Sequence, residues 1–114
     1  MLADTNWREF LLWVFRQRRR FRVMGESMLP LLQPGEEVLV DFRAYKRCSP
    51  QVGDLVIARH PQKRELQLIK RVKWIQENGD CFLLGENLAA STDSRQFGGV
   101  SPGLILGRVT CRFA

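Results

Sequence analysis

Lys70 is the residue whose surroundings in the sequence most suggest chemistry. If residues 66–72 form a β-strand, alternation of side chains places Lys70 on the same face as Leu66, Leu68 and Val72. Burial among apolar side chains disfavours the charged amine and lowers the lysine pKa from its usual value of about 10.4. A lysine that is neutral near pH 7 can act as a general base. The ordinary alternative is an ammonium that reaches water over a buried stem.

A base of this kind needs a nucleophile, and Ser27 is the candidate. It lies in Val23-Met24-Gly25-Glu26-Ser27-Met28-Leu29-Pro30. Gly25 permits unusual backbone dihedrals and Pro30 restricts the residue before it, so we expect Ser27 to occupy a constrained bend. A serine hydroxyl becomes a good nucleophile when a neighbouring base removes its proton. Ser27 and Lys70 together would need no histidine.

Short β-strands must position both groups. After Phe21 the chain alternates apolar runs with turn signals such as Pro34-Gly35 and Asn78-Gly79. This pattern predicts a mainly β fold, a coiled antiparallel β-barrel or sandwich. The predicted strands are 21–24, 36–42, 54–59, 66–75, 80–84 and 104–112.

An amphipathic helix is predicted before the strands. Apolar residues from Trp7 to Phe15 recur at three- and four-residue steps, which favours a single helix over residues 7–20 with a cap at Thr5 or Asn6. We therefore divide the chain into a basic helical segment, 1–21, and a β-domain, 22–114.

The positive charge is concentrated at the N-terminus. The 114 residues have a formal net charge of +6, and residues 1–22 contain six arginines against two acidic residues. Such a segment suits a membrane surface, nucleic acid or an acidic partner, or it is simply a solvated helix face. Because the rest of the chain is nearly balanced, we expect no nucleic-acid binding. Peripheral membrane contact stays open.

The sequence also argues against metal and membrane-spanning classes. Cys48, Cys81 and Cys111 show no Cys-x-x-Cys spacing, and His60 is the single histidine, so we expect no metal or other cofactor. The longest apolar run near the N-terminus, residues 10–15, is far shorter than the ~20 residues that span a bilayer. With unpaired thiols and no targeting signal, these features predict a cytoplasmic protein.

Four motifs occur in a fixed order along the chain. They are Gly25-x-Ser27-Met28-x-Pro30, Gly53-Asp54-x-Val56, Lys70-Arg71-Val72, and Gly85-x-Asn87 followed by Ser91-x-Asp93-Ser94-Arg95-x-x-Gly98. Together they resemble the signal peptidase I family of Ser/Lys peptidases, over about residues 22–109. Among members without an anchor, the run GDLVIARHP and the later STDSRQFG are similar to the nickel-type superoxide dismutase maturation peptidases.

This resemblance implies a role for each matching residue. Ser27 would be the nucleophile and Lys70 the general base, while the Ser91 hydroxyl orients the lysine amine. Asp93 and Arg95 would form an ion pair that supports the loop. The Ser27 backbone N–H would contribute to the oxyanion hole.

Substrate contacts follow from the same resemblance. An extended peptide would add as a strand beside the segment before Ser27, with pockets lined by Met24, Gly25 and Met28. Gly25 replaces a side-chain hydroxyl that some members use in the oxyanion hole, and Glu86 replaces the usual aspartate of the Gly-Asp-Asn motif.

The implied substrate is a precursor protein that loses an N-terminal propeptide, with the nickel superoxide dismutase precursor as the specific candidate and exported preproteins as the alternative. In that dismutase the trimmed N-terminus supplies the nickel ligands, and we hypothesise that the arginine-rich helix docks on an acidic precursor surface.

Three other readings remain at this stage. Ser27, His60 and Asp93 would form a catalytic triad, although we expect His60, next to Pro61, to be a turn or surface residue. A self-cleaving repressor is disfavoured because the chain contains no Ala-Gly or Cys-Gly bond. A non-catalytic β-module would bind nucleic acid or anionic lipid through the arginines, with a steep dependence on salt.

Overall fold

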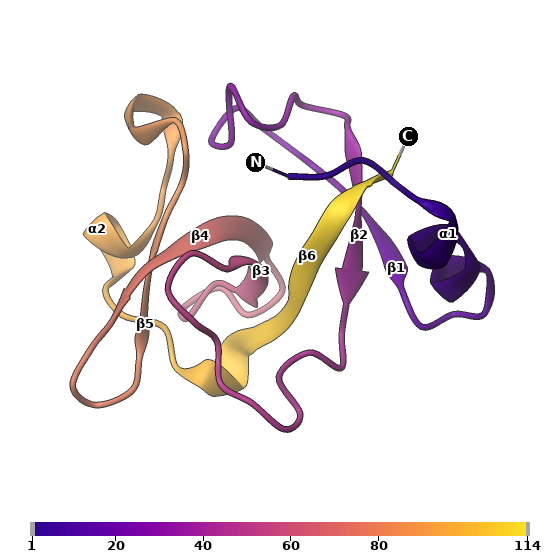
Figure 1. Ribbon diagram of the computed structural model, residues 1–114. Coiled ribbons are helices and arrows are strands. Elements are labelled where there is room, and N and C mark those ends of the chain that lie inside the picture. The colour runs from indigo at the N-terminus through magenta and orange to yellow at the C-terminus, as the bar shows by residue number, and fades with distance from the viewer. Residues whose placement is uncertain (1, 114) are drawn as a thin grey trace.

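Six antiparallel strands form one sheet in the computed structural model, which describes residues 2–113 (Figure 1). The order across the sheet is β1-β2-β6-β3-β4-β5, and within the described residues no pairing joins β1 to β5. The mainly β prediction is confirmed, with an open sheet rather than a closed barrel. The strands are β1 (Arg19–Arg22), β2 (Glu37–Asp41), β3 (Leu55–Arg59), β4 (Gln67–Ile75), β5 (Cys81–Leu84) and β6 (Ile105–Phe113).

All six predicted strands are present, with ends displaced by at most two residues. The β4–β5 hairpin turns where Asn78-Gly79 predicted it, because Gly79 adopts a positive φ of 91° and Gln76 N–H donates to the Asp80 carbonyl at 2.8 Å. Strand order brings chain segments that are far apart in the sequence against the same β3–β4 pair.

The N-terminal helix is shorter than predicted. Helix α1 (Trp7–Val14) begins at Asn6, whose side chain accepts from Glu9 N–H, and ends at a cap on Phe15. Arg16 then takes a positive φ of 64°, which a continuing helix does not allow. The prediction of helix to residue 20 is therefore wrong, since Arg19–Arg22 pair with β2 as strand β1.

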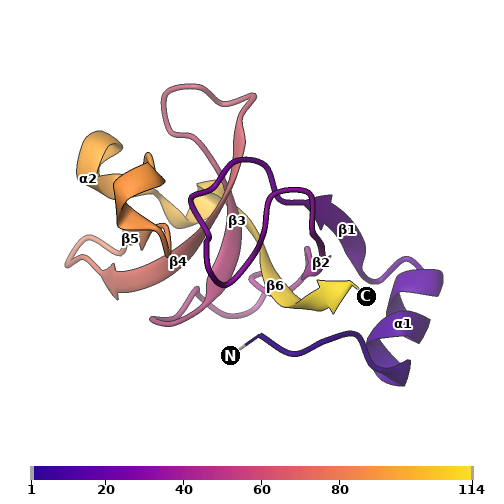
Figure 2. The ribbon, with the colours of Figure 1, turned by 90° about the horizontal axis from the view of Figure 1, so that it is seen from above.

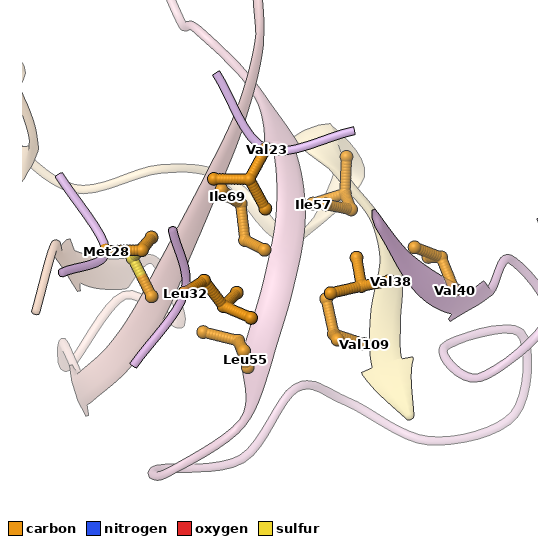
Figure 3. Packing of buried hydrophobic residues seen from close by; sticks show 9 residues of the cluster. All are labelled: Val23, Met28, Leu32, Val38, Val40, Leu55, Ile57, Ile69 and Val109. Carbon is orange, nitrogen blue, oxygen red and sulfur yellow. The ribbon is translucent and has the colours of Figure 1, made fainter. Parts of the chain in front are cut away.

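Both faces of the sheet are covered. Leu55 and Ile57 of β3 face one cluster, and Val56 and Ala58, alternating with them, face another. Residues 23–32 cover the first face (Figure 3). In the second cluster Val72 of β4, Cys81 and Leu83 of β5, Val100 and Ile105 pack against Val56 and Ala58.

Short helices lie at the margins of the sheet. Helix α2 (Ser94–Phe97) follows the 3₁₀ turn η1 (Leu88–Ala90), and a second 3₁₀ turn, η2 (Pro102–Leu104), precedes β6. In both ribbon views α1 and α2 lie at opposite ends of the molecule (Figures 1 and 2). Among the described residues no helix has the length and apolar character needed to cross a membrane.

Candidate active site

Lys70 is buried in the middle of β4, opposite Val56 of β3. Only 4% of its surface is exposed, so the expected burial on the apolar face is confirmed and a water-reaching ammonium is ruled out. Burial lowers the pKa of the amine; Asp93 opposes this shift and Arg95 adds to it. Leu66 does not help to bury the amine as expected, because it precedes β4 and is 44% exposed.

A chain of hydrogen bonds connects this amine to an ion pair. Lys70 Nζ donates to Ser91 Oγ at 3.0 Å, and Ser91 Oγ donates to Asp93 Oδ2 at 2.7 Å. Arg95 Nε donates to Asp93 Oδ1 at 2.9 Å. The structure thus brings together Lys70, Ser91, Asp93 and Arg95, four of the residues that the sequence singled out.

Helix α2 fixes the carboxylate in this chain. Asp93 is the N-cap of α2, and Gln96 Oε1 accepts from Asp93 N–H to complete a capping box. Burial alone would raise the Asp93 pKa, but hydrogen bonds from Arg95, Ser91 and Gly85 lower it to about 2. Asp93 is therefore a permanent anion at neutral pH, and it keeps Ser91 directed as an acceptor for Lys70.

Ser27 approaches the same place through its backbone. Its carbonyl accepts from Asn87 N–H at 2.7 Å, and Asn87 Nδ2 donates to the Glu26 carbonyl at 3.1 Å. A Cβ added to Gly85 would overlap with Ser91 Oγ and lie 2.7 Å from the Ser27 carbonyl oxygen. The Ser27 backbone and the partner of Lys70 therefore flank one glycine.

The structure does not join Ser27 and Lys70 directly. Within the described residues no hydrogen bond links the two side chains; the Lys70 amine is bonded to Ser91, and half-buried Ser27 keeps its hydroxyl free. The expected bend is present, since residues 25–32 form consecutive bends and turns and Gly25 has a φ of 74°. Hydrogen bonds between catalytic groups commonly tighten when substrate binds.

The three expected substrate-contact residues fall into two groups. Met24 immediately precedes the bend and Gly25 begins it, and both are exposed to solvent. Met28 has no exposed surface and packs in the core with Leu32 (Figure 3). Its role in this structure is packing, so it does not line an open pocket.

Arg71 makes contacts that sequence reasoning missed. Its guanidinium forms an ion pair with Glu86 and donates from Nη1 to the Gly53 carbonyl at 2.9 Å. Arg71 thereby ties together three of the sequence motifs, and it gives Glu86 a contact that the sequence left undefined. Arg71 follows Lys70 in the strand and therefore points to the other face of β4, and this alternation was the one sequence signal for its contacts.

The geometry is unfavourable for a histidine triad. His60 is buried, not on the surface, and its Nδ1 accepts from Gln62 N–H and Lys63 N–H, each at 3.0 Å. A triad requires that Nδ1 carry a proton and donate it to a carboxylate. Asp93 already serves Ser91, Arg95 and Gly85, so these residues do not form that arrangement.

The described residues contain no group of three or more His, Cys, Asp or Glu side chains that could hold a metal ion. All three cysteines are free; Cys81 and Cys111 are buried, and burial raises the pKa of both thiols. These thiols pack in the interior, while Cys48 is exposed.

Proteins of similar sequence are named as proteases. Mitochondrial ATP-independent inner membrane protease subunit 1b of Arabidopsis thaliana is 32% identical over 134 residues, covering 96% of this chain and 73% of that protein. Mitochondrial inner membrane protease subunit 1 is 33% identical in Schizosaccharomyces pombe, covering 77% of this chain and 68% of the relative, and 30% identical in Xenopus tropicalis, covering 77% and 64%.

These names contradict the cytoplasmic location that the sequence predicted. Unpaired thiols were weak grounds for that prediction, because they report the redox state of a compartment rather than attachment to a membrane surface. The family profile described as signal peptidase, peptidase S26, matches residues 9–75 and 73–114, which together include all but the first two residues of α1, the whole sheet and every residue of the buried Lys70–Arg95 chain. On this match and on the relatives' identity, the chain belongs to the S26 signal peptidase family.

Proposed function

We propose that the chain is a serine endopeptidase in which Ser27 is the nucleophile and Lys70 the general base. The observation that carries this proposal is the buried Lys70 amine, whose pKa is lowered and whose direction is fixed by Ser91. Membership of a peptidase family supports hydrolysis of peptide bonds. The proximity of the Ser27 backbone to Gly85 and Ser91 supports Ser27 as the partner of this amine.

The proposed reaction follows from these groups. The neutral Lys70 amine takes the proton of Ser27 Oγ as that oxygen attacks the substrate carbonyl carbon. Lys70 then returns the proton to the amine that leaves when the C–N bond breaks. Water, activated by the same amine, releases the acyl group from Ser27. The Ser27 N–H, which makes no hydrogen bond within residues 2–113, would donate to the developing oxyanion.

The substrate would bind as an extended strand beside Met24 and Gly25. Val23 is already paired on one side, because its N–H donates to Glu36 and its carbonyl accepts from Gly35. Met24 is exposed directly after this pair. A peptide added here gains main-chain hydrogen bonds and brings its scissile bond to Ser27.

Removal of an N-terminal propeptide from a precursor is the proposed biological reaction. The motifs GDLVIARHP and STDSRQFG favour the nickel superoxide dismutase precursor, and no relative reported above has that activity in its name. Cleavage of exported preproteins is the second candidate, favoured by the family match. In neither reaction do the described residues supply a metal site.

Incubation with both precursors, followed by mass spectrometry of the new N-termini, tests the proposal. We expect Ser27→Ala and Lys70→Met each to lower cleavage by a factor of about 10³ or more, because each removes an indispensable group. Ser101→Ala and Lys73→Met are matched controls, since both residues are exposed and Lys73 lies on the same strand as Lys70. Circular dichroism would establish that each variant is folded.

Three results would overturn the assignment. Full activity of folded Lys70→Met would show that Lys70 is not the general base. If folded His60→Ala were inactive while Lys70→Met stayed active, a histidine mechanism would be favoured. Tight binding to DNA with no Ser27-dependent cleavage of either precursor would favour the non-catalytic module. Cleavage of one precursor alone would decide between the two substrates.

A further inference from the structure

Helix α1 faces the domain with a polar side chain. Glu9, in the first turn, accepts from Arg18 Nε at 3.0 Å and from the Thr110 hydroxyl at 2.6 Å. Trp13 also faces inward, where its ring lies 4.8 Å from that of Phe113. These contacts, with the Asn6 cap, fix the rotation of the helix about its axis.

The opposite side of the helix is apolar and exposed. Positions 7, 11 and 14 lie on one face of an α-helix, with 10 and 15 at its margins. Trp7 is 79% exposed, Leu11 47% and Phe15 71%, and no residue of the helix is buried. The α1 apolar face, as we name it, consists of Trp7, Phe10, Leu11, Val14 and Phe15.

Positive charge borders this face. A hollow next to it is lined by Phe15, Arg16, Gln17, Arg19, Phe42 and Arg43. Within the described residues Arg16 and Arg43 form no ion pair, and the Arg19 guanidinium lies over the Phe42 ring at 5.1 Å. The hollow can therefore accept anionic groups beside the apolar residues.

We propose that the α1 apolar face and the adjacent arginine-lined hollow form a peripheral binding site for an anionic lipid membrane. Exposed aromatic and aliphatic side chains on a helix flanked by arginines suit the interface, where the rings enter the acyl boundary and the guanidinium groups meet lipid phosphates. Helix α1 lies at one end of the molecule in both views, where it can approach a membrane surface (Figures 1 and 2). A second copy would oppose arginine to arginine.

Sedimentation with vesicles tests this site, using 30% phosphatidylglycerol in phosphatidylcholine and pure phosphatidylcholine for comparison. The full chain should bind the anionic vesicles and lose binding as salt rises. We expect Leu11→Gln combined with Phe15→Gln to lower the partition coefficient at least tenfold. The matched control, Val52→Gln with Leu66→Gln, changes two exposed apolar residues elsewhere and should bind like the parent.

Charge is tested with a second matched pair. Arg16→Gln with Arg43→Gln should weaken binding to anionic vesicles by about 25-fold, at roughly fivefold per arginine near the surface. Lys63→Gln with Lys73→Gln removes the same charge from exposed lysines and should have little effect. Cleavage of a soluble peptide by the helix variants should equal that of the parent, which separates membrane binding from the proposed peptidase function.

Other outcomes would overturn the proposal. Equal vesicle binding by the parent and both test pairs would place lipid contact elsewhere. Self-association that Leu11→Gln with Phe15→Gln abolishes, without vesicle binding, would make the face a contact between copies. Binding of an acidic precursor through Arg16 and Arg43, again without vesicle binding, would assign it to substrate docking.

Discussion

The interior beside β4 and the outer side of α1 depart from the usual distribution of side chains in opposite ways. Beside β4 an amine, a hydroxyl and a carboxylate are buried. On α1 a tryptophan, a leucine and a phenylalanine are exposed while the glutamate faces the domain. In both places the arrangement runs against folding free energy, and a departure of this kind commonly marks function.

The two regions differ in how completely their groups are partnered. Within the described residues no buried side-chain nitrogen or oxygen lacks a hydrogen bond, and the Asp93 carboxylate alone accepts from three residues. By contrast, the side chains of the α1 apolar face stay exposed among residues 2–113. The polar groups of the buried site thus find their partners within the domain, whereas the α1 apolar face has surface available to a partner from outside.

Asp93→Asn would test this contrast in the buried site, with a large expected effect. Both carboxylate oxygens receive donors, so the amide NH₂ would face a donor in either orientation. We expect the free energy of unfolding near pH 7 to fall by about 2 to 3 kcal/mol, the usual value for hydrogen bonds to a charged group. The control is Asp4→Asn, since Asp4 is paired to Arg112 but 75% of its side chain is exposed; its loss should be under about 1 kcal/mol.

The same variant has a signature that a purely structural residue would not show. Asp93 raises the pKa of Lys70 through its charge, so its neutralisation should lower that pKa further. If Lys70 is the base, activity rises as pH increases through its pKa, and the acid limb of kcat/KM should move to lower pH in Asp93→Asn. A limb that stays fixed or moves upward would uncouple Asp93 from Lys70.

Gly85→Ala should have the next largest effect. Gly85 requires no positive φ; the constraint is space, since an added methyl group would overlap Ser91 Oγ and approach the Ser27 carbonyl. Forced displacement in a packed site costs about 1 to 3 kcal/mol, and cleavage should fall with it. Gly103→Ala is the matched control, because the nearest atom to its added carbon is 3.8 Å away. Equal stability of the two variants in urea denaturation would show that this site is not tightly packed.

Protonation of Asp93 at low pH should lower the free energy of unfolding of the parent chain to a smaller extent. The Asp93 pKa is about 2 in the folded chain and close to 3.9 when unfolded, so its contribution is complete above pH 4 and is lost as pH falls through 2. After allowance for screening the loss is about 1 to 2 kcal/mol. Urea midpoints at pH 5, 3 and 2 would measure it. Asp93→Asn lacks this carboxylate and should show a correspondingly smaller decline.

The strands could be predicted because their signals are local. Alternating side chains placed Lys70 on a buried face, and Asn78-Gly79 marked the β4–β5 turn. The end of α1 could not be predicted from local sequence. Arginine has a high helix propensity, so the arginines that follow α1 favoured a longer helix, whereas β1 forms only through its pairing with β2. The register of a distant strand is absent from any local window of sequence.

In the candidate site, too, local features could be predicted from the sequence and contacts between distant segments could not. Burial of Lys70 followed from periodicity, whereas the link to Ser91 depends on where α2 and its capping box lie against β4. Only the motif resemblance pointed to that link. The inward rotation of Glu9 on α1 was likewise invisible, since it requires Thr110 of β6 as a partner.

The smallest effect is expected from Leu11→Ala, and it contrasts most sharply with the same truncation of the buried Leu32. Leu32→Ala opens a cavity in the core, because Leu32 has no exposed surface, and should cost about 2 to 5 kcal/mol. Leu11→Ala on the α1 apolar face removes atoms that already meet water, and should change the free energy of unfolding by less than about 0.5 kcal/mol. Urea denaturation of both variants gives the comparison. A loss of unfolding free energy in Leu11→Ala close to that in Leu32→Ala would mean that α1 buries this face against its own domain in solution. The α1 apolar face would then be unavailable for binding a membrane.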